Sequence, residues 1–173
     1  TTLDTCRRGM PLLRSLNLLS SVALSLHFLH AAGIVHGDLK PQNVFLPRDL
    51  SVVDDGKLFW AKLSDLAFGR RLDEPENRRI GMGTIGYMAP EQIDGQPSSI
   101  QSDVFALGVM AYQLLSGEHP YLKGQSDPVV INAAVREDTP SSLSEIDPDI
   151  SGEVADLIAE LMSREALSRP QSA

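Results

Sequence analysis

The chain has 173 residues, of which 42% are hydrophobic and 22% charged, and this composition suits one soluble globular domain with a substantial core. A formal net charge of −8 argues against a broad nucleic-acid-binding face. The single cysteine, Cys6, excludes an internal disulfide. That is typical of a reducing compartment, so a cytoplasmic location is expected.

Apolar residues recur at helical spacing in the N-terminal part of the chain. They are Leu12, Leu13, Leu16, Leu19, Val22, Ala23, Leu26 and Leu29. This series predicts a helix from about residue 11 to residue 32, ended by Gly33. The stretch is the most apolar in the chain, but it carries Asn17, two histidines and several serines. A buried helix is therefore favoured over a membrane span, and no membrane segment is expected.

Two short strands are predicted next, at residues 44–46 and 61–63, and they would form a small β-hairpin. Their connection contains Asp54-Asp55-Gly56, which is a strong turn signal.

The second half of the chain is predicted to be helical. Residues 104–116 are apolar nearly all round, which indicates a helix buried on every side and ended by Gly117. Asp127-Pro128 predicts the cap and first turn of a helix through about Arg136, followed by a loop over 138–150. A last helix is predicted over 151–163, with Ser151 as its candidate cap. The expected fold class is mainly α with a small β-hairpin.

The most informative segment is residues 36–43, which read His-Gly-Asp-Leu-Lys-Pro-Gln-Asn. It places an acid (Asp38), a cation (Lys40) and a carboxamide (Asn43) at fixed offsets in one short loop. Phosphoryl transfer needs such a set: a carboxylate that orients the attacking hydroxyl and accepts its proton, a lysine near the transferred phosphate, and an oxygen ligand for Mg²⁺.

The order of these residues resembles the protein-kinase catalytic loop, H-R-D-L-x-x-x-N, with Gly37 where the family usually has arginine. Four more segments resemble kinase elements in the right order. They are Ser64-Asp65-Leu66-Ala67 (D-F-G), Met88-Ala89-Pro90-Glu91 (A-P-E), Asp103-Val104-Phe105-Ala106-Leu107-Gly108 (D-x-W-x-x-G) and the late arginine, Arg169. Over roughly residues 10–170, the chain is similar to the C-terminal lobe of a eukaryotic-type Ser/Thr protein kinase.

The resemblance implies that residues 1–173 are a partial protein kinase domain. Before His36 there is no Gly-rich loop, strand lysine or helix glutamate, and a kinase normally continues through one more helix after Arg169. The expectation is a fragment in which the N-terminal lobe and the final helix are absent. Because positioning supplies most of the catalysis in phosphoryl transfer, the fragment alone is expected to be inactive or nearly so.

The same resemblance implies roles for individual residues. Asp38, Lys40 and Thr84 are expected to be catalytic, with the threonine hydrogen-bonded to the other two. Asn43 and Asp65 are expected to bind Mg²⁺, because this hard cation prefers oxygen ligands.

ATP is the expected nucleotide, with Lys40, Asn43, Phe45 and Asp65 as its contacts. Phe45 has an alternative interpretation as an ordinary apolar strand residue.

Scaffold roles follow from the resemblance as well. Glu91 and Arg169 are expected to form a partly buried ion pair, and Asp103 to accept backbone hydrogens from the catalytic loop. His36 is expected to be structural, beneath the Mg²⁺-binding aspartate. The remaining histidines, His27, His30 and His119, have no constellation around them and are interpreted as packing or surface residues.

Two departures from the family pattern agree with each other. Gly37 replaces the arginine that normally receives an activation-loop phosphate, and residues 66–83 contain no Ser, Thr or Tyr. The hypothesis is that this loop is not switched on by phosphorylation and is either ordered by its own charges or merely solvated. Ala67 replaces the D-F-G glycine, which predicts a stiffer hinge at Asp65.

The expected function is ATP-dependent transfer of phosphate to Ser or Thr of protein substrates by the parent protein. The alternative is a pseudokinase, a kinase-like module that binds partners without phosphotransfer. A small-molecule phosphotransferase is disfavoured by the A-P-E element. No nucleic-acid partner is expected.

Overall fold

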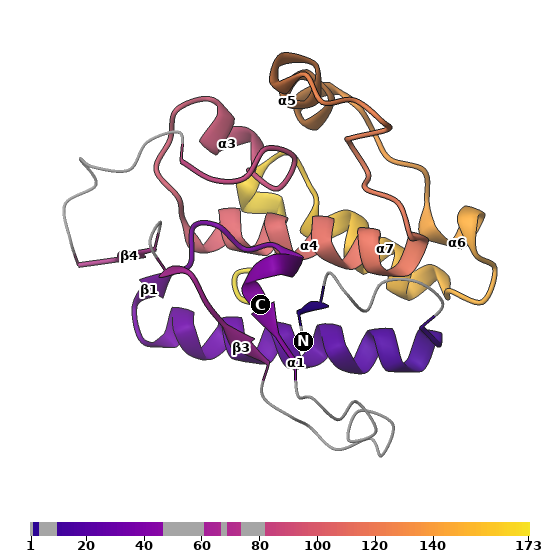
Figure 1. The fold of residues 1–173 in the computed structure, drawn as a ribbon, viewed down its shortest axis with the longest axis horizontal. Coiled ribbons are helices and arrows are strands. Elements are labelled where there is room, and N and C mark those ends of the chain that lie inside the picture. The colour runs from indigo at the N-terminus through magenta and orange to yellow at the C-terminus, as the bar shows by residue number, and fades with distance from the viewer. Residues whose placement is uncertain (1, 4–9, 47–60, 67–68, 74–81) are drawn as a thin grey trace.

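A computed structural model describes residues 2–3, 10–46, 61–66, 69–73 and 82–173, and all structural statements below refer to these ranges. Helices dominate and two small antiparallel sheets complete the fold (Figure 1). In chain order the elements are α1 (Leu12–Ala31), β1 (Ile34–Val35), the 3-10 turn η2 (Pro41–Asn43), β2 (Val44–Phe45), β3 (Lys62–Leu63), β4 (Arg70–Arg71), α3 (Pro90–Ile93), α4 (Ile100–Ser116), α5 (Pro128–Glu137), α6 (Leu143–Ile146), α7 (Gly152–Leu161) and the 3-10 turn η4 (Ala166–Ser168).

The predicted N-terminal helix is confirmed as α1. Gly33 ends it with a φ of +74°, a conformation that glycine adopts without steric cost. One face, which includes Leu18, Val22 and Leu26, is buried against the rest of the fold, and α1 contacts α4, β1 and β3. By length and composition alone α1 could cross a membrane, but the core helix of a soluble protein meets the same criterion.

The predicted β-hairpin is confirmed, with each strand shorter than expected. β2 pairs antiparallel with β3, with Val44 opposite Leu63 and Phe45 opposite Lys62. A second pair was not predicted: β1 pairs antiparallel with β4, with Val35 opposite Arg70. The two arginines of β4 show no alternation of apolar and polar residues, and the partner strand β1 lies more than 30 residues earlier in the chain.

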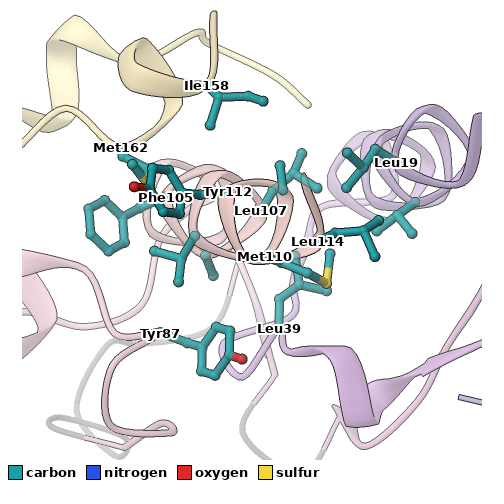
Figure 2. Close-up of a cluster of buried hydrophobic side chains, with 14 of the residues drawn as sticks. Leu19, Leu39, Tyr87, Phe105, Leu107, Met110, Tyr112, Leu114, Ile158 and Met162 are labelled. Atoms are coloured by element: carbon teal, nitrogen blue, oxygen red, sulfur yellow. The ribbon is translucent and has the colours of Figure 1, made fainter. Parts of the chain in front are cut away.

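Helix α4 is the centre of the core. Every residue from 102 to 114 is buried, as the apolar pattern predicted. Ser99 caps its start, and Gly117 ends it at a φ of +78°. Figure 2 shows α4 surrounded on several sides, with Leu19 of α1, Leu39 and Tyr87 of two loops, and Ile158 and Met162 at the C-terminal end of the chain.

The capping predictions for the last long helices are also confirmed. The Asp127 side chain accepts a hydrogen bond from the Val129 N–H at the start of α5, and Ser151 accepts one from Val154 at the start of α7. The segment 138–150 was predicted to be a loop, and this is wrong in part because it contains the one-turn helix α6. Helix α3 is equally short, and neither is long enough to show a helical period.

Glu91 and Arg169 form the predicted ion pair. Both outer guanidinium nitrogens of Arg169 donate to the Glu91 carboxylate, at 2.6 and 2.8 Å. The same guanidinium donates to the backbone carbonyls of Ser163, Gln101 and Arg164, and it lies 5.0 Å from the centroid of the Phe105 ring. The Arg169 side chain is fully buried. It therefore joins the start of α3, helix α4 and the end of the chain.

Removing this brace is expected to destabilise the fold severely. Arg169→Met should lower the free energy of unfolding by about 3–5 kcal/mol, because the Glu91 carboxylate and three carbonyls lose their donor. Urea unfolding followed by circular dichroism measures this. The matched control is Arg136→Met, which breaks the exposed pair with Asp94 and should cost less than about 1 kcal/mol. Equal losses in the two variants would contradict the assignment.

The contact between α4 and α7 limits the size of residue 108. A Cβ at Gly108 would lie 2.8 Å from Leu161 Cβ and from Met162 Cγ. Gly108→Ala is therefore expected to lower the free energy of unfolding by about 1–3 kcal/mol through overpacking. Gly152→Ala, where an added Cβ meets nothing within 4 Å, should instead stabilise α7 by about 0.5–1 kcal/mol. Thermal unfolding of both variants measures whether their changes in stability have opposite signs.

Candidate functional site

The loop at residues 36–42 is held in place by one carboxylate from the buried helix α4. Asp103 Oδ2 accepts the His36 N–H at 2.7 Å, and its Oδ1 accepts the Gly37 N–H at 2.9 Å. The predicted role of Asp103 is thereby confirmed. Because α4 is packed on all sides, the shape of this loop is tied to the core.

His30 supports the same carboxylate, which the sequence did not reveal. Its Nε2 lies 2.9 Å from Asp103 Oδ2, and both side chains are almost completely buried. The geometry places a hydrogen on Nε2, since a carboxylate only accepts. The interpretation of His30 as an ordinary packing or surface residue missed this contact. The two residues are 73 positions apart, and no local pattern links them.

Asp38, Lys40 and Thr84 form a closed triangle of hydrogen bonds. Lys40 Nζ donates to Asp38 Oδ2 at 2.8 Å and to Thr84 Oγ1 at 2.6 Å. The Thr84 hydroxyl in turn donates to Asp38 Oδ1 at 2.7 Å. The expectation that Thr84 bonds both partners is confirmed.

The triangle keeps Asp38 ionised. Burial by itself raises the pKa of Asp38, but the hydrogen bonds from Lys40 and Thr84 outweigh it and leave the pKa below its ordinary value. A carboxylate of low pKa is a weak base, so its main contribution would be to orient a hydroxyl group.

Asn43 is oriented by the backbone around it. Its Nδ2 donates to the Asp38 carbonyl at 2.9 Å and approaches Asp38 Oδ2 at 3.3 Å. Among the described residues, Oδ1 of Asn43 accepts no hydrogen bond, so this oxygen is available to a cation.

Asp65 follows the hairpin strand that lies beside Asn43. Ser64 donates to the Asn43 carbonyl through its N–H at 2.9 Å and its hydroxyl at 3.2 Å, so Asp65 is the next residue along from this contact. Asp65 is exposed and has a φ of +63°, a left-handed conformation that is uncommon outside glycine. A free amide oxygen and an exposed carboxylate on adjoining segments are a donor set that fits Mg²⁺.

His36 is buried and neutral. Burial lowers the pKa of His36, and the nearby carboxylates of Asp103, Asp38 and Asp65 only partly oppose this. Its Nδ1 faces the Asp38 N–H at 3.3 Å, which is a long hydrogen bond. A neutral ring packed under the loop agrees with the expected structural role.

Phe45 lies on β2, the strand that follows Asn43, and its side chain is 45% exposed. An isolated antiparallel bridge joins Phe45 to Thr2. The structure therefore presents this ring at the surface beside the site and does not bury it as an ordinary core residue. The place of Phe45 on a strand, on which the alternative interpretation rested, is confirmed.

Part of the 66–83 loop lies outside the described residues, including Ala67, so the hinge prediction remains a prediction. Within the described part, the Arg71 guanidinium pairs with the Asp73 carboxylate through two hydrogen bonds of 3.0 Å at the surface. Of the charges expected to order the loop, Glu74, Glu76, Arg78 and Arg79 also lie outside the described residues.

Comparisons with known proteins agree with this geometry. The model of the protein kinase domain family matches residues 10–173. The chain is 33% identical over 162 residues to the DNA damage-responsive serine/threonine-protein kinase RqkA of Deinococcus radiodurans, covering 94% of this chain and 23% of that protein. It is 29% identical over 164 residues to the serine/threonine-protein kinase PknB of Mycolicibacterium smegmatis, covering 92% of this chain and 24% of that protein.

A third relative is the serine/threonine-protein kinase PknJ of Mycobacterium tuberculosis, with 30% identity over 162 residues that cover 92% of this chain and 27% of that protein. The chain thus spans about a quarter of the length of these curated relatives. With the family model matched over nearly all of its length, this chain belongs to the protein kinase domain family.

Proposed function

We propose that the protein carrying this chain transfers the γ-phosphate of ATP to serine or threonine side chains of protein substrates, with Mg²⁺ as the metal. The observation that carries the proposal is the hydrogen-bonded triangle of Asp38, Lys40 and Thr84. These are the groups that position a hydroxyl and neutralise a phosphoryl group, and its relatives named above are serine/threonine-protein kinases.

Each residue of the triangle has a separate task in the proposed reaction. Asp38 accepts a hydrogen bond from the substrate hydroxyl and directs its oxygen toward the phosphorus atom. Lys40 stabilises the negative charge that develops on the phosphoryl oxygens. Thr84 holds both side chains at a fixed separation, so that the hydroxyl and the phosphoryl group meet in line.

Asn43 and Asp65 would hold the metal and Phe45 the nucleotide. Among the described residues, the Asn43 Oδ1 accepts no hydrogen bond and the Asp65 carboxylate is exposed on the adjoining segment, and the exposed Phe45 ring offers an apolar surface for the adenine base. When bound, Mg²⁺ neutralises charge on the phosphate oxygens.

We further propose that residues 1–173 correspond to the C-terminal lobe of the kinase domain. The described elements are mainly helical, and the proposed site lies on the segment from β1 to β2, on Asp65 just after β3 and on Thr84 before α3. Binding of the nucleotide from one side only would leave the phosphates poorly positioned, so the isolated chain is expected to be a weak catalyst or inactive.

The second candidate is a pseudokinase that binds partners without phosphotransfer. Gly37 and Ala67, which depart from the family pattern, favour it. The complete Asp38–Lys40–Thr84 triangle is the observation against a pseudokinase. A protein that only binds partners does not require an ionised carboxylate that is hydrogen-bonded to both a lysine and a threonine.

Substitution of Asp38 should separate the two candidates. In the full-length protein, Asp38→Asn is expected to lower Mg²⁺-dependent transfer of phosphate from ATP to a protein substrate by about 10²–10⁴-fold, because the amide cannot accept the proton. Transfer of radiolabelled phosphate measures this. Asp156→Asn, at an exposed position of α7, is the matched control and should retain full activity. If the wild-type protein binds ATP but transfers no phosphate, the pseudokinase candidate is supported instead.

The pH dependence of the reaction should report the environment of Asp38. Its pKa is lowered, so the carboxylate stays ionised as the pH falls through the ordinary range and activity is lost only below it. Thr84→Val removes one of the hydrogen bonds that lower the pKa of Asp38. The acid limb of the pH profile of kcat/KM should therefore move to higher pH. The control Thr139→Val, at an exposed threonine, should leave the limb in place. Absence of a shift in Thr84→Val would count against Asp38 as the titrating group.

A further inference from the structure

A hollow of about 540 Å³ lies between helix α4, the loop at residues 138–142, helix α6 and helix α7. None of the residues that line it belongs to the proposed catalytic site. Ligand pockets in proteins have volumes of about 300–1,000 Å³, so this hollow has the size of a binding site.

The floor of the hollow is apolar and aromatic. It is formed by four side chains that are each at most 8% exposed: Tyr121, Leu143, Ile158 and Met162. Ile158 and Met162 lie on one side of α4 (Figure 2). Burial raises the pKa of Tyr121 to about 12, so its phenol is neutral at physiological pH. The floor therefore offers uncharged surface of the kind that receives an apolar anchor side chain.

Hydrogen bonds fix the loop that forms one wall of the hollow. The Tyr112 hydroxyl donates to the Ser141 carbonyl at 3.2 Å. One guanidinium nitrogen of Arg164 donates to the Glu137 carbonyl at 2.5 Å and to the Thr139 hydroxyl at 3.2 Å. The wall is thus held both from α4 and from the segment after α7. Because it is already ordered, a ligand spends little free energy on arranging it.

The walls come from a strongly acidic stretch of the chain. Residues 137–163 contain eight aspartates and glutamates and neither lysine nor arginine. At the rim, Asp138 pairs with Lys123 at 3.0 Å. Glu145 also lines the hollow and is exposed, and its carboxylate forms no hydrogen bond or ion pair with the described part of the chain. A rim of this charge attracts basic ligands and repels acidic ones.

We propose that the hollow is a docking site for a segment of another protein in which an aromatic or large aliphatic side chain is flanked by lysines or arginines. The apolar side chain occupies the floor, and its basic neighbours face Glu145 and the acidic walls. A partner bound there is tethered to the kinase domain without filling the proposed catalytic site. The proposal concerns binding alone, so it does not rest on the proposed function.

The test measures the binding of two fluorescein-labelled synthetic peptides to the full-length protein by fluorescence anisotropy. One peptide carries tryptophan and leucine between two pairs of lysines, and the other has glutamates in place of the lysines. The wild type should bind the lysine peptide at least tenfold more tightly than the glutamate peptide. Hydrogen exchange should show that the lysine peptide protects residues 138–145.

Three variants locate the binding. Ala159→Phe fills the hollow from an exposed position of α7 and should weaken binding of the lysine peptide at least tenfold. Glu145→Lys reverses the charge at the rim and should weaken it at least fivefold. The matched control is Glu160→Lys, an exposed position of α7 outside the lining, which should stay within twofold of the wild type. Thermal unfolding checks that all three variants are folded.

The proposal would be overturned if the wild type bound both peptides equally or neither of them. Equal weakening by Glu145→Lys and Glu160→Lys would show that only the overall charge attracts the peptide. If Ala159→Phe changed the exchange of residues 138–145 without any peptide and left peptide binding intact, a segment of the same protein would occupy the hollow. That result would exclude a separate partner.

Discussion

The Asp103 carboxylate is the contact on which the rest of the site depends. It is buried in the middle of the fold, and it receives hydrogen bonds from two consecutive backbone N–H groups of the catalytic loop and from the His30 ring. A buried carboxylate is stable only when its lone pairs are satisfied, so the loop and Asp103 require each other. Through these hydrogen bonds the 36–42 loop is anchored to the buried helix α4.

Helix α4 also contacts a buried positive charge. Near its start, the Gln101 carbonyl accepts a hydrogen bond from Arg169, whose guanidinium lies against Phe105. Arg169 binds Glu91 on α3, just beyond the segment that contains Thr84. One helix therefore fixes the 36–42 loop through Asp103 and supports the Thr84 segment through Arg169. The hydrogen bonds among Asp38, Lys40 and Thr84 then connect the 36–42 loop to the segment that contains Thr84.

The sequence predicted those features whose signal is local. The four long helices follow from apolar spacing and caps, and the β-hairpin follows from two short apolar runs around a turn. The candidate site was predicted because short motifs define it, and the bonds of Thr84, Asp103 and Arg169 match those expectations. The β1–β4 pair, the contact of His30 with Asp103 and the hydrogen bond from Arg70 to the Ser98 carbonyl were not predicted. Each joins residues far apart in the chain, and nothing in the local composition marks them. The one-turn helices α3 and α6 were missed because four residues are too few to show a period.

The left-handed backbone at Asp65 restricts which side chains evolution can place there. A conformation with φ of +63° is tolerated by glycine, asparagine and aspartate far better than by longer or branched residues. For the proposed Mg²⁺ ligand, glycine would bring no ligand atom and asparagine no charge, whereas glutamate would keep the charge at a steric cost. The backbone conformation and the proposed metal role would thus favour aspartate for two independent reasons.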